Sequence, residues 1–165
     1  MSPLKKGVLV ALLQVLLVGS VGAKFVYDRV AYPKAWLKTQ PFDPNLPIRG
    51  RYVRLAIIVE LDNKASPQGD YASRPVRLAV RDGNLVAIPD RAGPRSVHSA
   101  RCGQQACWVL SEPVAYFIPE HAQDPSIRKP GEELWVEATI PPNGPPRPIQ
   151  LGVKVEGKLV SLEIN

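Results

Sequence analysis

The two cysteines of the chain are spaced so that they could form a disulfide within one hairpin. Cys102 and Cys107 enclose the four residues Gly-Gln-Gln-Ala. If these four residues form the hairpin loop, the cysteines face each other with Cα atoms about 4.5–5.5 Å apart, within the range of a disulfide. Two reduced thiols are the alternative. A zinc site is not expected, because His98 and His121 are the only histidines and there is no second cysteine pair.

Serine and histidine could support nucleophilic catalysis, but their placement does not favour it. Residues 96–99 (Ser-Val-His-Ser) lie in a polar stretch between Arg95 and Arg101, which predicts a loop and not a nucleophile elbow. The order of apolar segment, proline-rich stretch and strand also resembles membrane-bound signal peptidases, which need a serine soon after the anchor and a lysine base. No serine lies between Ser20, inside the apolar run, and Ser66. We therefore expect no enzymatic activity, no metal and no cofactor.

Positive charge is concentrated in the first half of the region that follows the N-terminal segment. The chain carries 21 Lys and Arg against 15 Asp and Glu, a net charge of +6. Arg49 to Arg101 holds ten of the positive residues and five of the acidic ones. Such a surface could meet anionic lipid headgroups, an acidic partner or nucleic acid. Nucleic acid is not expected, because aromatic residues do not interleave with the arginines. The simpler interpretation is a sheet with arginines on its solvated face.

The N-terminus has the composition of a membrane anchor. After Lys5 and Lys6, the run Gly7–Ala23 contains no charge and one amide. As a helix it would extend about 26 Å, short of a hydrocarbon core of about 30 Å, but it lengthens to about 31 Å if Lys24 snorkels and the next three residues continue it. We therefore expect a single transmembrane helix in residues 1–30, embedded in the lipid bilayer. The alternative is a signal peptide cleaved after Ala23, because Val-Gly-Ala before that point suits a cleavage site.

The charges that flank this helix leave its orientation open. Two lysines precede it, and four positive residues follow it closely, which read literally would place the C-terminal domain in the cytoplasm. Long domains, however, are translocated largely regardless of such charges, and a short Lys-Lys leader has the form of a secretory n-region. We expect the domain to be extracytoplasmic. The same location would favour the bond between Cys102 and Cys107, because disulfides persist in oxidising compartments.

Proline and alternating apolar residues predict a β-rich domain. The chain has 18 prolines and 12 glycines, which leaves little room for long helices. Residues 31–48 hold four of the prolines and are predicted to form a stiff, extended linker. Residues 49–165 are predicted to form one barrel- or sandwich-like domain, making the fold class mainly β. The seven or eight expected strands are the apolar or alternating stretches 53–61, 76–81, 85–88, 108–110, 114–118, 134–140, 149–155 and 160–164, with tight turns at Asp82-Gly83 and Glu156-Gly157.

One strand of this domain carries the signature of a known family. Gly50, Tyr52 and Leu55 are spaced as in the GDYXXLXY family of membrane-anchored proteins, whose signature is Gly-Asp-Tyr, two residues, Leu, one residue, Tyr. The sequence departs from the signature at Arg51, which replaces its Asp, and at Ile57, which replaces its last Tyr. The family has no established activity. From the residues alone, Gly50 would enter the strand through a turn or bulge, and Tyr52 would lie along its polar face.

A second segment supports the resemblance. Tyr116-Phe117-Ile118-Pro119-Glu120 is similar to the Tyr-Phe-Val-Pro-Glu segment of that family, and the strand Leu134–Ala138 follows in the same order. Pro119 and Glu120 would end a strand, and Glu120 could pair with an arginine for about 0–1 kcal/mol. Members of the family resemble one another as an N-terminal membrane segment plus an extracytoplasmic β-rich domain. They often occur alongside multi-spanning membrane proteins of unknown function.

Two functions fit these features, and they leave the oligomeric state open. The first is a non-enzymatic, single-pass membrane protein whose β-domain binds or stabilises a multi-spanning membrane partner. The second is an exported or anchored domain that binds a ligand or an envelope polymer through a basic face.

Overall fold

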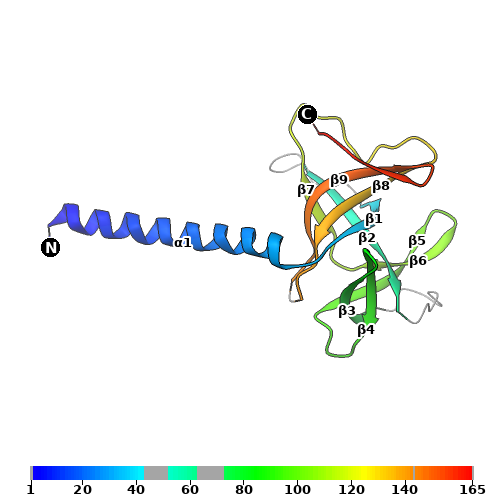
Figure 1. Ribbon diagram of the computed structural model, residues 1–165, viewed down its shortest axis with the longest axis horizontal. Helices are drawn as coiled ribbons and strands as arrows, with labels where there is room; N and C mark the ends of the chain where they lie inside the picture. Colours follow the sequence, from blue (N-terminus) through cyan, green and yellow to red (C-terminus); the bar gives the residue numbers. More distant parts are fainter. Residues whose placement is uncertain (1, 43–51, 63–72, 143, 165) are drawn as a thin grey trace. The chain divides into compact units, whose positions relative to one another are not determined.

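A computed structural model of the protein describes residues 2–42, 52–62, 73–142 and 144–164. The chain divides into two units, Met1–Tyr32 and Pro33–Asn165. The described residues form one helix followed by ten strands (Figure 1). The strands are β1 (Lys34–Pro41), β2 (Tyr52–Leu61), β3 (Arg74–Arg81), β4 (Asn84–Pro89), β5 (Arg95–Cys102), β6 (Gln105–Leu110), β7 (Val114–Phe117), β8 (Glu132–Thr139), β9 (Arg147–Val155) and β10 (Lys158–Ser161).

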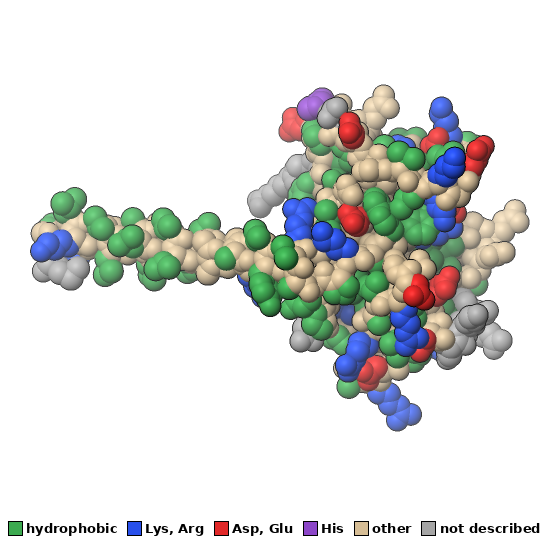
Figure 2. Space-filling view, viewed as in Figure 1, with side chains coloured by type: hydrophobic (Ala, Val, Ile, Leu, Met, Phe, Trp, Pro, Cys, Tyr) green, Lys and Arg blue, Asp and Glu red, His purple; other side chains and the backbone are tan. Residues whose placement is uncertain are grey.

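The first unit is helix α1, which spans Pro3–Ala31. It includes an 18-residue stretch with a mean hydropathy of 2.1 and is long and apolar enough to cross a membrane. Apolar side chains are exposed around this helix (Figure 2). It ends before Tyr32, whose backbone is extended, because Pro33 disfavours a helical conformation in the preceding residue. The predicted apolar helix is confirmed, and it continues eight residues past Ala23.

Strand β2 pairs with four other strands and connects the two parts of the β-domain. Along one edge its first half pairs with β7 and its second half with β6; along the other edge it pairs with β1 and then β4. Strands β2, β4, β3, β5 and β6 form a closed ring, because β6 pairs back onto β2. Outside the ring, β1, β8, β9 and β10 continue the sheet in that order. Only the contact between β2 and β4 is parallel among the described pairs.

The core follows the alternation of the strands. Leu55 and Ile57 on β2 are fully buried, and the side chains of the same face on the neighbouring strands complete one continuous cluster. Alternation places Arg77 and Arg81 on the opposite face of β3, which is exposed as predicted. The Asp82-Gly83 and Glu156-Gly157 turns have positive φ at both residues, which matches the twist of the strands that they join.

Two segments differ from the sequence predictions. Residues 34–41, expected to lie in a linker, form β1, an interior strand that pairs with β2 and β8. Its prolines do not interrupt pairing, because Pro33 precedes the strand and Pro41 is its last residue. Residues 96–99, expected to lie in a polar loop, belong to β5, which pairs with β3 and β6. Only Val97 of β5 is buried, so its sequence lacks a clear apolar alternation.

The position of Leu55 predicts a large cost for its truncation. The substitution Leu55→Ala should lower the free energy of unfolding by about 2–5 kcal/mol, because it removes a fully buried side chain from the strand shared by both parts of the domain. Val160 on β10 is 62% exposed, and Val160→Ala should change stability by less than about 0.5 kcal/mol. Denaturant unfolding of the full-length chain measures both. Equal effects of the two substitutions would contradict this placement of the core.

Candidate functional site

The family-signature positions are divided between the core and the surface. Leu55 is fully buried, and Tyr116 on β7, which lies opposite Val53, packs partly against the core. Tyr52 lies on the other face of β2 and is half-buried. Pro119 and Glu120 are exposed after the end of β7. Gly50 lies outside the described residues. The structure therefore brings Tyr52 and the Tyr116 segment together on paired strands, although they are distant in sequence.

Aromatic side chains gather on the outer face of this strand pair. Tyr52 is the cross-strand partner of Phe117, and their ring centroids are 6.0 Å apart. Two residues along β2, the guanidinium of Arg54 lies 4.9 Å from the centre of the Phe42 ring. Phe42 is placed there by a hydrogen bond from its backbone N–H to the carbonyl oxygen of Arg54. We call these four residues, Phe42, Tyr52, Arg54 and Phe117, the aromatic strip.

The aromatic strip exposes apolar surface that could bind a partner. Phe117 is 73% exposed and Phe42 is 40% exposed. Within the described part of the β-domain, the other large apolar side chains with comparable exposure are Ile127, Val155 and Val160. Aromatic residues and arginine are enriched where protein interfaces derive most of their binding energy. The strip therefore has the composition of an interface, and two contacts already hold its side chains in place.

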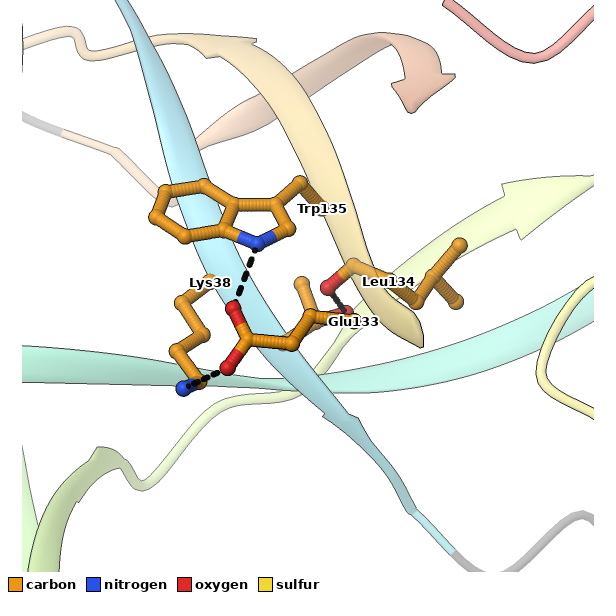
Figure 3. A network of polar contacts seen from close by, with 5 residues as sticks. Lys38, Glu133, Leu134 and Trp135 are labelled. Carbon is orange, nitrogen blue, oxygen red and sulfur yellow. Dashed lines mark hydrogen bonds and ion pairs between the residues drawn. The ribbon is translucent and has the colours of Figure 1, made fainter. Parts of the chain in front are cut away.

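A second feature lies on the outer face of β1 and β8. The Lys38 ammonium donates a hydrogen bond of 2.5 Å to Oε1 of Glu133, and the indole N–H of Trp135 donates to Oε2 at 3.2 Å (Figure 3). Lys38 and Trp135 are cross-strand partners, which explains why both reach the same carboxylate. Lys154 of β9 places its ammonium 4.8 Å from the centre of the Trp135 ring. The hydrogen bond from Lys38, followed by that from Trp135, lowers the pKa of the Glu133 carboxyl despite partial desolvation.

This network borders a groove with a second tryptophan. Trp36 lies two residues before Lys38 on β1, and its ring packs against Gly152 of β9. A Cβ atom at position 152 would lie 2.7 Å from that ring, so only glycine leaves room for the indole. The groove, of about 190 Å³, is lined by Trp36, Lys38, Ile58, Glu60, Asn84 and Trp135 together with their chain neighbours Leu37, Val59 and Leu85. We call it the tryptophan groove.

Several described arginines of the predicted basic face are matched by acidic or aromatic groups. Arg77 pairs with Asp90 at 3.0 Å, and Arg81 pairs with Asp62. The backbone N–H of Ala92 and, to a smaller extent, Arg77 lower the pKa of Asp90. Arg74 lies over the Trp108 ring at 5.0 Å. In the view of Figure 2, acidic side chains are interspersed with the basic ones.

Cys102 and Cys107 form a disulfide with a Cα–Cα distance of 5.8 Å. The predicted bond is present, but the predicted four-residue loop is wrong. Cys102 lies opposite Gln105 and Cys107 lies opposite Ala100, so the bond joins diagonal positions on one face of the β5–β6 hairpin. The turn consists of two residues and begins at Gly103 with φ 63°, a conformation that glycine adopts readily and that allows the tighter turn.

The Ser-His stretch is part of the exposed face of β5. His98 Nδ1 lies 3.3 Å from Oγ of Ser111, which follows β6. Ser111 is exposed, and the contact lies on a sheet surface and not in a cleft. Within the described ranges, no group of three His, Cys, Asp or Glu side chains is arranged to hold a metal.

Comparison of the chain with protein-family models, with curated proteins and with solved structures found no match. The resemblance to the GDYXXLXY family therefore stays a prediction that rests on the residues quoted for it.

Among the residues of the two surfaces, the sequence pointed only to Tyr52 and to Phe117, which lies in the segment Tyr116–Glu120. The other residues of the aromatic strip and those of the tryptophan groove were not identified. The predicted linker included Trp36 and Lys38. The buried residues Ala35, Leu37 and Thr39 alternate with them, as in a half-buried strand. That alternation is the signal that could have identified β1. The partners Glu133 and Trp135 required the cross-strand register between β1 and β8.

The ion pair between Lys38 and Glu133 predicts a pH-dependent contribution to stability. Because the folded-state pKa of Glu133 is lowered from about 4.5, its contribution is present above the unfolded pKa and is lost as the pH falls through the folded pKa. The free-energy difference between wild type and Glu133→Gln should therefore be larger at pH 7 than at pH 3. Both side chains are about 40% exposed, so we expect a difference of at most about 1 kcal/mol.

Denaturant unfolding of wild type and of Glu133→Gln at pH 7 and pH 3 measures this difference. The control is Glu163→Gln, which also removes one exposed carboxylate. A difference that stays constant or grows as the pH falls would contradict the prediction.

Proposed function

We propose that the chain is a non-enzymatic, single-pass membrane protein whose extracytoplasmic β-domain binds, and thereby stabilises, a multi-spanning membrane partner. The aromatic strip on β2 and β7 carries the proposal, since it combines exposed aromatic rings with an arginine on the strands of the family signature. Three further observations support it: the length of α1, the short connection to β1 and the pairing of the arginines.

The length and composition of α1 support a retained anchor. Its 29 residues extend about 43 Å as a helix, more than the hydrocarbon thickness of about 30 Å. The helix is apolar on all sides, and helices with this pattern occur in membranes or in the cores of large proteins. Because the helix passes through Ala23 without a break, the region that would contain a cleavage site is helical. The apolar helix continues past Ala23 to Ala31, which favours retention.

The connection between α1 and β1 restricts the partner. Only Tyr32 and Pro33 separate the helix from the first strand. Each residue spans at most about 3.6 Å, so Lys34 lies within about 11 Å of Ala31. A flexible linker of 18 residues would have allowed the domain to sample distant partners, but this connection does not. The domain of an inserted chain therefore meets mainly proteins that are themselves at the membrane surface.

The second candidate function, binding of an envelope polymer through a basic face, has less support. Arg77 and Arg81 of this region pair with carboxylates, and Arg74 lies over an aromatic ring. Paired charges attract a polyanion less strongly than unpaired ones, because binding would first have to displace the acidic partner. The net charge of +6 is thus not equivalent to an open basic surface.

Variant-dependent co-purification tests the proposed partner. Full-length tagged protein is isolated from its own membranes in mild detergent, and the recovered proteins are identified. Wild type should retain a multi-spanning protein, and Phe42→Ser/Phe117→Ser should reduce its recovery about tenfold or more, because aromatic residues are the usual anchors of interfaces. Val160→Ser, which changes an exposed side chain on the distant edge strand β10, should retain it. Equal recovery with both variants, or no multi-spanning protein with wild type, would refute the proposal.

The redox state of the cysteines tests the location of the domain. Because the disulfide requires an oxidising compartment, Cys102 and Cys107 should resist alkylation when the protein is denatured directly from cells without reductant. Both should be labelled after reduction, as measured by intact mass. Two labelled thiols before reduction would contradict the extracytoplasmic location. The same mass also shows whether residues 1–23 are retained.

A further inference from the structure

The tryptophan groove is separate from the aromatic strip and has the properties of a small-ligand site. Its walls come from three distant parts of the chain, with Trp36 and Lys38 on β1, residues 58–60 on β2, and Trp135 on β8; Asn84 at the start of β4 completes the rim. The volume of about 190 Å³ is below the range of about 300–1,000 Å³ typical of drug-sized ligands. It therefore suits a single ring-sized unit or one unit of a longer chain that passes along the surface.

Both indole rings are fixed before any ligand binds. Trp135 is held by its hydrogen bond to Glu133 and by the ammonium of Lys154. Trp36 is held against the backbone of Gly152, where no side chain larger than hydrogen fits. A binding surface that is already ordered loses little side-chain entropy when it binds. This arrangement favours a ligand with a flat apolar face that can lie against an aromatic ring.

The charges of the groove cancel within it. Lys38 is neutralised by Glu133, Lys154 lies over Trp135, and Glu60 is exposed at the rim. A strongly charged ligand would therefore gain little net attraction. A nucleic acid strand is disfavoured, because single-strand sites need a continuous positive groove.

We propose that the tryptophan groove binds one unit of a neutral saccharide. A sugar ring has an apolar face of C–H groups, which can lie on an indole, and a rim of hydroxyls, which can exchange hydrogen bonds with Glu60, Asn84 and Lys38. The C–H hydrogens carry a partial positive charge, which the negative face of an aromatic ring attracts. This site would act independently of the partner bound by the aromatic strip.

The test uses the full-length chain in lipid nanodiscs, because glycoside detergents belong to the proposed ligand class. Calorimetric titration with maltohexaose, cellohexaose and hexameric N-acetylglucosamine covers three neutral backbones, and hexagalacturonate is the anionic counterpart. At least one neutral oligosaccharide should bind saturably. Trp135→Ala should weaken that binding about tenfold or more, as expected for loss of an aromatic anchor.

Two further variants keep the test decisive. Glu60→Ala changes an exposed rim residue that the fold does not require, and it should weaken binding several-fold even if Trp135→Ala fails to fold. Phe117→Ser, in the aromatic strip, is the matched control and should leave saccharide affinity unchanged. The proposal is overturned if no neutral oligosaccharide binds, if only hexagalacturonate binds, or if Glu60→Ala and Phe117→Ser affect binding equally.

Discussion

Strand β2 is hydrogen-bonded along both edges, and the rest of the β-domain depends on that pairing. Its ten residues are shared among four strands, so β2 has hydrogen-bonding partners along both edges although no single strand follows its whole length. The partners of β2 change near Ile57 and Ile58. The first half of β2 pairs with β1 and β7, and the second half pairs with β4 and β6, which closes the ring. Its inward side chains must then be apolar throughout, as Leu55, Ile57 and Val59 are.

The outer face of the same strand contributes residues to both candidate surfaces. Tyr52 and Arg54 contribute to the aromatic strip, while Ile58 and Glu60 line the tryptophan groove. Between them, Ala56 is almost fully buried, so the two surfaces are interrupted by a packed position and are not one continuous patch. Strand β1 contributes to both as well, through Trp36 and Lys38 in the groove and Phe42 immediately after its end. A change in the register of β1 against β2 would therefore disturb both sites.

Sequence patterns predicted the elements whose signals are local. The odd positions of residues 53–61 are all apolar, and Asp-Gly and Glu-Gly turns require positive φ, so β2 and the β3–β4 and β9–β10 hairpins were predictable. Strand β1 was obscured by prolines that lie only at its boundaries, and β5 by the lack of a clear apolar alternation, since Val97 is its only buried residue. The disulfide was predictable from spacing, but its diagonal register depended on the conformation of Gly103. Neither surface could be assembled from the sequence, because each combines side chains more than 50 residues apart whose contact depends on strand order.

Because the aromatic strip is small, the proposed partner contact depends on the proposed membrane anchor. Four residues cover much less than the roughly 800 Å² per partner of a standard interface, so the strip in solution would bind weakly. Restricting both proteins to one membrane makes the encounter effectively intramolecular and raises the local concentration, which allows a weak contact to be occupied. The short connection after α1 strengthens this effect, since it limits the volume that the domain can sample. In the proposed function, helix and strip would contribute different parts of one binding free energy: the strip would supply the contact, and the helix would raise the local concentration of the partner.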